Sequence, residues 1–383
     1  MQTNKQVVVI FDFRNVIGGG SEEVILRHKN YAQILITRSD LGLHVHSRGG
    51  KTINTDKTFS HSVSGSSIIG IFKYCRVLAT YLRKQNLDPV LLISGDPWES
   101  LVSARLFRFI FAKRAPIQVQ FHGDIGARKW KFLNVRNFIR FFFAKLSLGN
   151  KSNMYFRSTS NLQAKHLEKA FNIPPKKNDV LPVGINLDFV RTPTKKNETT
   201  IRIAFVGRLH KDRGTKEFVG LIKSLKSIHS QLEVVIVGDG PEMDTLGAAF
   251  AEFHDLKIRF EGYLQGSSLY NIWSQVDVLL SLAPLESFGR TVREALISGT
   301  PVLAIPSSGI LELDLALTNQ WVQLVEWPIN SSKVIKQLYK AKKIEIPLDY
   351  RNHLANESLE SKFKLVNRWI ELARLPDSLT GMS

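Results

Sequence analysis

Cysteine, acidic residues and long apolar runs are all scarce in this chain of 383 residues. The single Cys75 excludes an internal disulfide and a cysteine-based metal site, and we expect it to be a small side chain in the core. One cysteine agrees with a reducing compartment. No apolar stretch approaches the roughly 18 residues that span a membrane, and the run before Asp12 and Arg14 is too short for a signal peptide. The sequence therefore predicts a cytoplasmic protein.

The shortage of acidic residues gives the chain a strongly basic balance. It holds 34 Asp and Glu against 52 Lys and Arg, a formal net charge of +18, and such a surface attracts anions. The excess is concentrated between Ser100 and His166, where Asp124 is the only acid. Aromatic residues such as Trp130 and Phe132 are interleaved with the cations. The basic residues of this cationic region are Arg105, Arg108, Lys113, Arg114, Arg128, Lys129, Lys131, Arg136, Arg140, Lys145, Lys151, Arg157 and Lys165.

The cationic region contains a predicted amphipathic helix, residues 135–146. At helical spacing one face is apolar, and Arg136 and Arg140 lie opposite. Two interpretations compete: a core helix with its apolar stripe on the N-terminal sheet, favoured for the stripe alone, or an interfacial helix that docks on an anionic membrane, favoured by the surrounding charge. The apolar stripe consists of Val135, Phe138, Ile139, Phe142 and Leu146.

Short apolar strands alternate with helical patterns along the chain, which is typical of parallel sheets with crossover helices. A stretch rich in Pro, Lys, Thr and Asn, residues 191–200, reads as an exposed linker, and a second alternating unit begins at Ile201. The length favours two domains, one on each side of this linker. In the first half the expected strands are residues 6–13, 32–38 or 44–48, 88–94, 116–123 and 153–159.

The most informative segment is ESFGRTVREALISGTPVLA, residues 286–304. It predicts a helix from about Gly289 to Ser298 that Ser287 caps and Gly299 ends before a strand. The amides at a helix N-terminus suit a phosphate. Glu286 and Glu294 flank this position, and carboxylates are good acceptors for sugar hydroxyls. The combination predicts a nucleotide-sugar pocket.

The spacing E-S-F-G-x-x-x-x-E-A-x-x-x-G-x-P-V resembles the signature of GT-B glycosyltransferases, in particular the retaining family 4 type. Upstream, VGRLHKDRG (residues 206–214) resembles the family's "GRL...KG" segment, and VVIVGDGPEMDTL (residues 234–246) its next strand and turn. IRFEGYL (residues 258–264) follows in the family order. The resemblance is colinear from about Ile201 to Leu313.

This resemblance implies an α/β protein with the GT-B fold, in which two Rossmann-like domains with parallel sheets face an interdomain cleft. Residues 1–195 would form the acceptor-binding domain, and residues 200–350 would form the domain that binds the nucleotide sugar. Residues 355–375 would form a C-terminal helix that crosses back to the first domain.

By the same resemblance, Arg208 and Arg213 would neutralise the diphosphate as the glycosidic bond breaks. The family usually has lysine at the position of Arg213, and Lys211 is an alternative for that role. Glu286 would bind a hydroxyl of the transferred sugar and Glu294 the ribose hydroxyls. Further expected donor contacts are the amides of Ser287, Phe288 and Gly289 and, at the base, Tyr263 and Leu264.

In the first domain the resemblance points to a Gly-Gly loop, Gly18 and Gly19, that faces the donor. His122 corresponds to the His-Gly of retaining enzymes and would reach the donor sugar near the reacting carbon. Asp124 has two interpretations, an acceptor-orienting carboxylate or a turn residue.

We therefore expect a glycosyltransferase that moves a hexose-type sugar from a UDP-, GDP- or ADP-sugar to a saccharide or lipid-linked saccharide with retention. It would act in the synthesis of a cell-surface polysaccharide or glycolipid. It would be a peripheral protein at the inner face of the membrane. No metal or other cofactor is expected, since no Asp-x-Asp follows a strand. The alternatives are an inverting enzyme with Asp124 or His122 as base, a relative that only binds a nucleotide sugar, and a basic nucleic-acid-binding protein; the glutamate spacing argues against nucleic acid as a partner.

Overall fold

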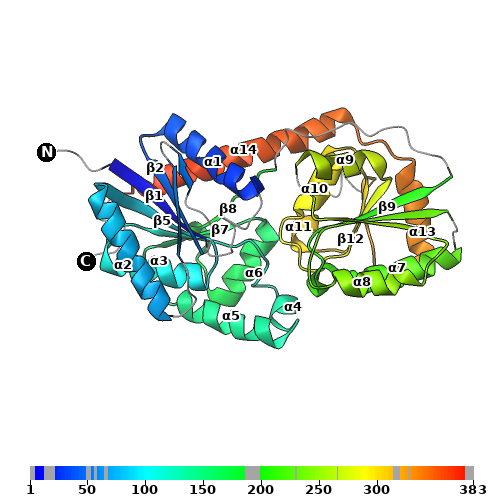
Figure 1. The fold of residues 1–383 in the computed structure, drawn as a ribbon, viewed down its shortest axis with the longest axis horizontal. Coiled ribbons are helices and arrows are strands. Elements are labelled where there is room, and N and C mark those ends of the chain that lie inside the picture. The colour runs from blue at the N-terminus through cyan, green and yellow to red at the C-terminus, as the bar shows by residue number, and fades with distance from the viewer. Residues whose placement is uncertain are drawn as a thin grey trace. The chain divides into compact units, whose positions relative to one another are not determined.

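The chain forms two compact units, residues 1–182 with 360–383 and residues 183–359 (Figure 1). The computed structural model describes residues 5–12, 22–48, 53–55, 58–63, 68–185, 199–228, 231–264, 266–313, 320–326 and 328–375. Within this part of the chain, no helix is both long and apolar enough to cross a membrane.

Unit 1 is built on an eight-stranded sheet with the strand order β3-β4-β2-β1-β5-β6-β7-β8. Its neighbouring strands are parallel except for the antiparallel pair β3 and β4. The strands are β1 (Lys5–Asp12), β2 (Gly42–Arg48), β3 (Ile53–Thr55), β4 (Thr58–Val63), β5 (Leu87–Ser94), β6 (Ile117–Gln120), β7 (Met154–Ser158) and β8 (Asn178–Val180). The helices are α1 (Glu22–Arg38), α2 (Ile68–Lys84), α3 (Glu99–Ile110), α4 (Arg128–Lys131), α5 (Val135–Ser147), α6 (Asn161–Phe171) and the 3-10 turn η1 (Pro175–Lys177).

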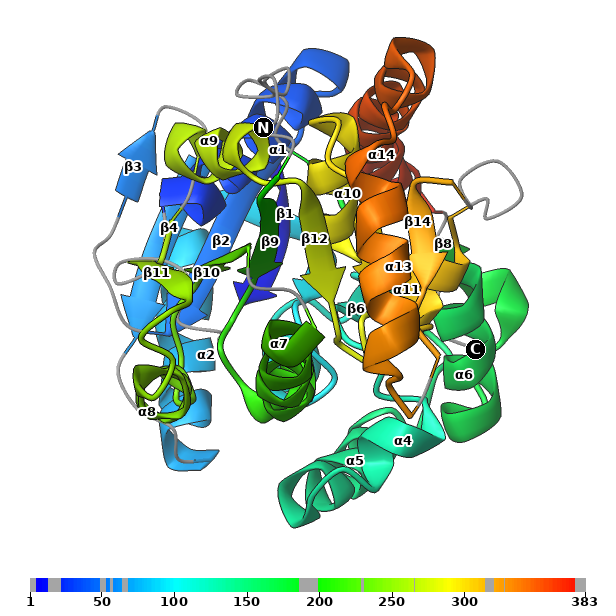
Figure 2. The same cartoon turned by 90° about the vertical axis from the view of Figure 1, so that its right-hand side faces the viewer.

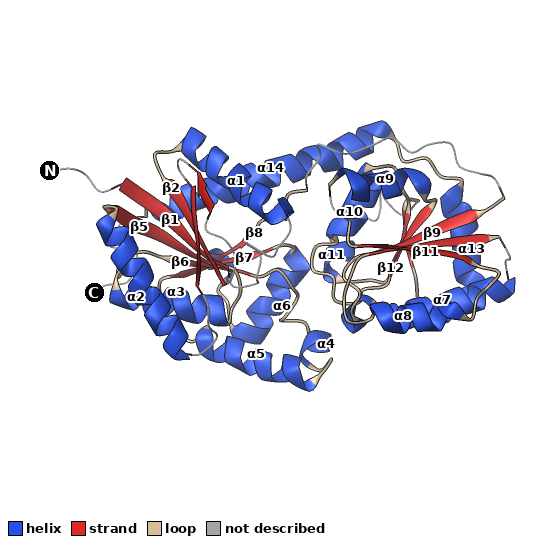
Figure 3. Cartoon of the chain, viewed as in Figure 1, coloured by secondary structure: helices blue, strands red, loops and turns tan. Residues whose placement is uncertain are grey.

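Successive side chains of the unit 1 strands are buried on opposite faces of the sheet, as expected for a sheet that helices cover on both sides. Val7 and Val9 of β1 pack on the face covered by α2, α3, α5 and α6. Val8 and Ile10 pack on the other face, against α1 and the last helix of the chain. Figure 3 shows helices on both sides of the strands.

Unit 2 is built on a six-stranded sheet, entirely parallel, with the order β11-β10-β9-β12-β13-β14. The strands are β9 (Ile201–Val206), β10 (Leu232–Val237), β11 (Lys257–Gly262), β12 (Val278–Ser281), β13 (Val302–Ala304) and β14 (Val322–Leu324). The helices are the 3-10 turn η2 (Lys211–Arg213), α7 (Thr215–Ile228), α8 (Met243–Ala251), α9 (Ser267–Gln275), α10 (Arg290–Ile297), α11 (Ser308–Leu311) and α13 (Ser331–Lys342).

Renumbered from its first strand, the unit 2 sheet has the order 3-2-1-4-5-6 of a doubly wound nucleotide-binding fold. Helices α7, α8 and α13 pack on one face, and α9 and α10 on the other. The strand order reverses between β9 and β12, which Figure 2 shows side by side. Ligands of such sheets bind beyond the carboxyl ends of the strands at this reversal.

Helix α14 (Leu348–Ala373) belongs to both units, since the unit boundary falls within it after Leu359. Leu354 packs in a core of unit 2, whereas Trp369 is fully buried in unit 1. The Trp369 indole donates a 2.9 Å hydrogen bond to Gln118 Oε1 and meets the Tyr31 ring edge to face at 5.3 Å. The helix begins at Leu348, earlier than the expected residue 355, and the first unit boundary falls at residue 182, earlier than 195.

Local expectations for unit 1 can be compared with the observed elements. Of the two alternatives for the second strand, residues 44–48 are correct, because they lie in β2, whereas residues 32–38 belong to α1. Cys75 is a buried core residue as expected. Burial raises the pKa of its thiol to about 12, so the group is unreactive at neutral pH.

The predicted helix of the cationic region is α5, but its apolar stripe does not pack on the sheet. Val135 and Leu146 are about three-quarters exposed, at 75% and 76%. The buried side of α5 instead consists of Asn137, Phe141 and Ala144. The core-helix interpretation of the stripe is therefore wrong. Arg157, counted with the cationic region, is also buried, where it donates to backbone carbonyls after β8.

Candidate functional site

A cavity of about 220 Å³ lies in unit 2 where the strand order reverses. It opens at the carboxyl ends of β9 and β12 and reaches the first turn of α10, so elements distant in sequence share it. Its lining residues are Phe205, Val206, Gly207, Arg208, Arg213, Leu279, Leu280, Ser281, Leu282, Ala283, Glu286, Gly289, Arg290, Thr291 and Val292.

Glycines allow the loops around the cavity to approach one another closely. A Cβ on Gly238, at the end of β10, would lie 1.8 Å from the carbonyl oxygen of Gly207. A Cβ on Gly214 would lie 2.3 Å from the carbonyl oxygen of Leu282, and Gly214 also has a left-handed φ of 76°. These contacts explain why the segments that resemble the family motifs carry glycine at these positions.

Arg213 and Glu286 form an ion pair within the cavity, through Nη1 and Oε2. They are far apart in the sequence and reach each other from η2 and from the loop after β12. Burial acts to lower the pKa of Arg213, but the carboxylates of Glu286 and Asp212 outweigh burial and raise it. Arg213 is therefore a permanent cation inside a partly enclosed pocket.

Arg208 lies at the exposed side of the cavity, with 58% of its side chain accessible. Asp212 holds it through a 2.9 Å bond from Arg208 Nη2 to Oδ2, and the other carboxylate oxygen lies 2.8 Å from His210 Nδ1. One carboxylate thus organises the cationic side of the site. Sequence reasoning missed Asp212, although its place between Arg208 and Arg213 was a usable signal.

The turn that carries Glu286 is fixed by its neighbours. The Glu286 carbonyl accepts from Gly309 N at 2.8 Å and from Ser308 Oγ at 3.2 Å. Arg293 donates to the carbonyls of Phe288 and Gly309, and its guanidinium carbon lies 4.1 Å from the centroid of the Phe288 ring. Burial lowers the pKa of Arg293 to about 10, which still leaves it charged. Arg293 was also missed, because nothing in the sequence pairs it with residue 309.

Helix α10 begins one residue later than expected, and the prediction that Ser287 caps it is wrong. The N-cap residue is Gly289, with a left-handed φ of 72° and no side-chain cap. The helix ends before Gly299, which has a φ of 85°, as predicted. The Phe288 amide points toward Glu286 Oε1 at 3.5 Å, a long distance for a hydrogen bond.

The structure brings four expected residues together in the cavity, namely Arg208, Arg213, Glu286 and Gly289. Ser287, Phe288 and Glu294 are buried beside it and are not among the described residues that line it. Glu294 Oε1 accepts from Arg290 Nε at 2.8 Å. Tyr263 and Leu264 follow β11 and do not line the cavity either, nor does Lys211 in η2.

Of the candidates in unit 1, Gly18 and Gly19 fall outside the described residues, and His122 and Asp124 lie on the loop after β6. His122 follows β6 with its side chain exposed, whereas Asp124 is buried and its Oδ2 lies 2.8 Å from His166 Nδ1.

The fold, with two α/β units on largely parallel sheets, is the GT-B fold, as expected from the sequence. Residues 188–351 match the model of the family described as glycosyl transferases group 1. This stretch contains the cavity and both segments that carry its charged residues.

Curated relatives match about 29% of the chain, and two of them serve as examples. The 2-deoxystreptamine glucosyltransferase of Streptomyces kanamyceticus is 31% identical over 112 residues, 29% of each chain. The GDP-mannose-dependent alpha-mannosyltransferase of Corynebacterium glutamicum is 31% identical over 111 residues, 29% of this chain and 24% of its own. The chain thus matches less than a third of the length of these relatives.

Among solved structures, HepE of Anabaena in complex with UDP and glucose superposes with a TM-score of 0.66 at 16% identity. The alignment covers 97% of this chain and all of the other. At this identity the likeness shows the fold.

The ion pair in the cavity leads to a prediction about affinity. A phosphate bound at Arg213 would have to displace the Glu286 carboxylate, so we expect Glu286→Gln to bind free UDP or GDP about fivefold more tightly, the equivalent of an ion pair worth roughly 1 kcal/mol. Isothermal titration calorimetry with each nucleotide measures the change.

Glu233→Gln is the matched control, because Glu233 pairs with Arg202 at 2.8 Å on β10 and β9 and lies outside the cavity. It removes the same charge and should leave nucleotide affinity unchanged. Weaker binding by Glu286→Gln would show that the carboxylate does not compete with the ligand.

Proposed function

We propose that this protein transfers a hexose-type sugar from a nucleoside-diphosphate sugar to a saccharide or lipid-linked saccharide, in the synthesis of a cell-surface polysaccharide or glycolipid. The observation that carries the proposal is the convergence of Arg208, Arg213 and Glu286 on one cavity at the strand reversal of a doubly wound sheet. The names of the relatives agree with it, since one is GDP-mannose-dependent and one solved neighbour holds UDP and glucose.

In this proposal the two arginines bind the diphosphate and stabilise the negative charge that grows on it as the glycosidic bond breaks. Arg213 suits the inner position because it is a permanent cation, and Arg208 can swing from Asp212 because it is exposed. Once a phosphate has taken Arg213, the Glu286 carboxylate is released to accept a sugar hydroxyl. Glu294 would hold the ribose after a change in its contact with Arg290.

The sequence resemblance supports transfer with retention. In such a transfer the acceptor attacks the same face of the sugar from which the diphosphate departs. His122 takes part in the transfer step, and Asp124 is a candidate for contact with the acceptor. A panel of UDP-, GDP- and ADP-sugars identifies the base of the donor.

Substitution in the cavity tests the proposal. We expect Arg208→Ala and Glu286→Ala each to lower turnover about 100-fold, since each removes a contact strengthened in the transition state. The measurement is nucleoside diphosphate released across a panel of donor sugars, with product NMR for the anomeric configuration. Lys257→Ala, an exposed cation of β11, is the control. Unchanged turnover in both cavity variants would refute the assignment, and an inverted product would refute retention.

Metal dependence is a separate test. Because cationic side chains meet the diphosphate, we expect turnover to persist within about twofold after treatment with a chelator. The measurement is released nucleoside diphosphate with and without EDTA, and with Mg²⁺ or Mn²⁺ added back. Complete loss in chelator with recovery on adding the metal would contradict a metal-free reaction.

We also place the enzyme at an anionic membrane, because unit 1 exposes apolar and cationic side chains on one layer of helices. Helix α5 exposes Phe142, Phe143 and Leu146, and Lys131 lies 4.6–5.5 Å from the centroids of four phenylalanine rings. Apolar groups that insert between headgroups and cations that meet lipid phosphates act together in peripheral binding. This combination favours a lipid surface at the inner face of the membrane over nucleic acid.

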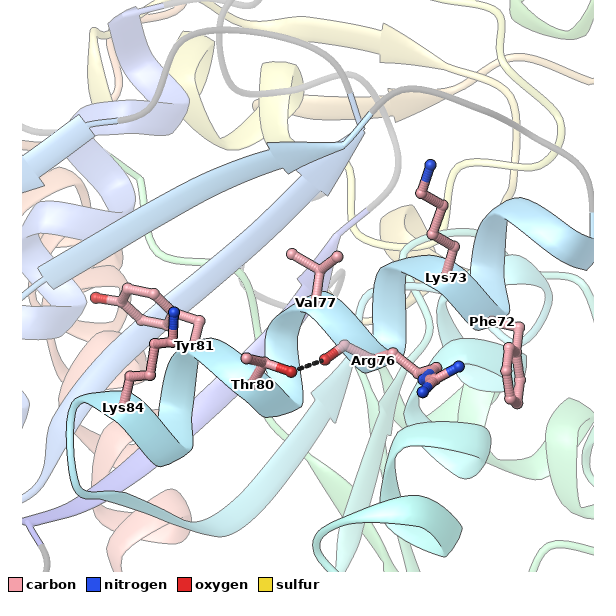
Figure 4. Close-up of a pocket in the computed structure, with 7 residues that line it drawn as sticks. All are labelled: Phe72, Lys73, Arg76, Val77, Thr80, Tyr81 and Lys84. Carbon is pink, nitrogen blue, oxygen red and sulfur yellow. Dashed lines mark hydrogen bonds between the residues drawn. The ribbon is translucent and has the colours of Figure 1, made fainter.

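Helix α2 extends this surface, since α2, α3 and α5 cover the same face of the sheet. A hollow of about 560 Å³ lies along α2, and no acidic residue is among the described residues that line it. Figure 4 shows its lining side chains, Phe72, Lys73, Arg76, Val77, Thr80, Tyr81 and Lys84. The mixture of cations and exposed apolar groups matches that of α5.

Replacing Phe142, Phe143 and Leu146 with serine removes three apolar anchors. The change should lower the binding of the protein to vesicles that contain anionic lipid at least about tenfold in a flotation assay. Phe141 is left intact because it is buried, with its ring 4.8 Å from that of Phe171. UDP binding should not change.

The control for this experiment is serine at Leu311, Tyr339 and Leu348, which are exposed apolar residues of unit 2. Undiminished vesicle binding by the α5 variant would remove the membrane proposal. Salt-sensitive binding to an oligonucleotide in place of vesicles would favour a nucleic-acid partner.

A further inference from the structure

His122 is an exposed side chain on a loop that is otherwise largely buried. The loop, residues 121–127, follows β6 at the carboxyl edge of the parallel sheet of unit 1. Phe121 and Asp124, on either side of His122, are both buried. Ligand contacts of open α/β sheets come from this edge.

One buried carboxamide holds the backbone on both sides of His122. Gln163 of α6 is fully buried, and its Nε2 donates to the carbonyl of Phe121 at 3.3 Å and to that of Gly123 at 2.9 Å. Its Oε1 accepts from the amide of Thr159 at 2.6 Å and from the hydroxyl at 3.0 Å. The amide therefore uses both donors and both acceptor positions.

Helix α6 holds the same loop at two further points. Asp124 Oδ2 lies 2.8 Å from His166 Nδ1. At Gly126 a Cβ would lie 2.6 Å from the carbonyl carbon of His166, so the loop backbone rests directly on the helix. The Ser160 hydroxyl accepts from the amide of Gln163 and fixes the start of α6.

We propose that Gln163 and the Asp124–His166 pair are positioning residues that set the direction of the His122 imidazole for sugar transfer. This inference rests on the proposed function. A satisfied buried network is rigid, and a rigid support is what a side chain needs to be held within a fraction of an ångström of its working geometry. Asp124 contributes to this support through Oδ2, which contacts His166, whereas the satisfied part of the network is the Gln163 carboxamide.

Hydrogen exchange tests the support without any assay of activity. Gln163→Met keeps the side-chain length but removes both hydrogen bonds to the loop, and Gln163→Glu turns the two donors into acceptors that face two carbonyls. Exchange of the amides of residues 121–127 should rise at least about tenfold in both variants, because fewer contacts hold the loop. Asn153→Ala, a buried amide at the amino end of β7, is the control for general destabilisation. Unchanged protection of the loop would overturn the inference.

Turnover tests what the support does. Gln163→Met should lower kcat about tenfold to 100-fold, as expected for a small misplacement of a reacting group, with the affinity for UDP in unit 2 within about twofold of the original. In a His122→Ala background, Gln163→Met should leave kcat almost unchanged, because a positioning residue has no effect once the group it positions is gone. Equal losses in both backgrounds would overturn the inference.

The two proposals fail differently. If His122→Ala and Gln163→Met both keep full turnover although exchange of the loop rises, the positioning role is overturned while the donor cavity of unit 2 stands on its own variants. If Arg208→Ala also keeps full turnover, the proposed function is refuted as well.

Discussion

The constraint on which this molecule depends is the right-handed crossover of parallel strands. Each connection must return over one face of the sheet, so the helices lie to one side until the strand order reverses. In unit 2 the reversal falls between β9 and β12, whose following loops run to opposite faces. The cavity occurs there because no crossover helix covers the space between those loops. The glycines at 214 and 238 then allow the loops to approach closely enough to bring Arg213 within reach of Glu286.

The second feature is the pairing of each arginine that lines the cavity with a carboxylate. An arginine directed at a diphosphate would be an uncompensated cation in a partly buried site, and the cost of such a charge is large unless it is paired. Glu286 supplies the partner for Arg213, Asp212 for Arg208, and Glu294 for Arg290. Glu286 and Glu294, which the resemblance assigns to sugar hydroxyls, therefore also hold arginine side chains in place. A phosphate that replaced Glu286 at Arg213 would leave this cation paired, because one anion would take the place of another beside it.

Much of this site could be predicted from the sequence, because spacing fixes which residues lie near a helix N-terminus. Spacing gave Glu286 and Gly289, and the resemblance of residues 206–214 to a family segment gave Arg208 and Arg213. The sequence does not predict that Arg213 pairs with Glu286, or that Arg293 bonds to Phe288 and Gly309. Each of these contacts joins separate loops or helices. The same holds for Gln163, which lies on α6 and serves a loop some forty residues earlier in the chain. Long-range polar contacts leave no periodic signal.

Helix α5 shows a different limit of sequence reasoning. Its stripe of large apolar residues has helical spacing, but Phe141, Ala144 and Leu148 form a second apolar side. When two sides of a helix are apolar, periodicity alone does not say which one faces the sheet. The structure buries the side on which Ala144 lets the helix approach closely and leaves the larger residues outside. An apolar face without a partner in a folded protein is costly in water, and with the cations that flank this face it is the reason why we propose an anionic lipid surface as its partner.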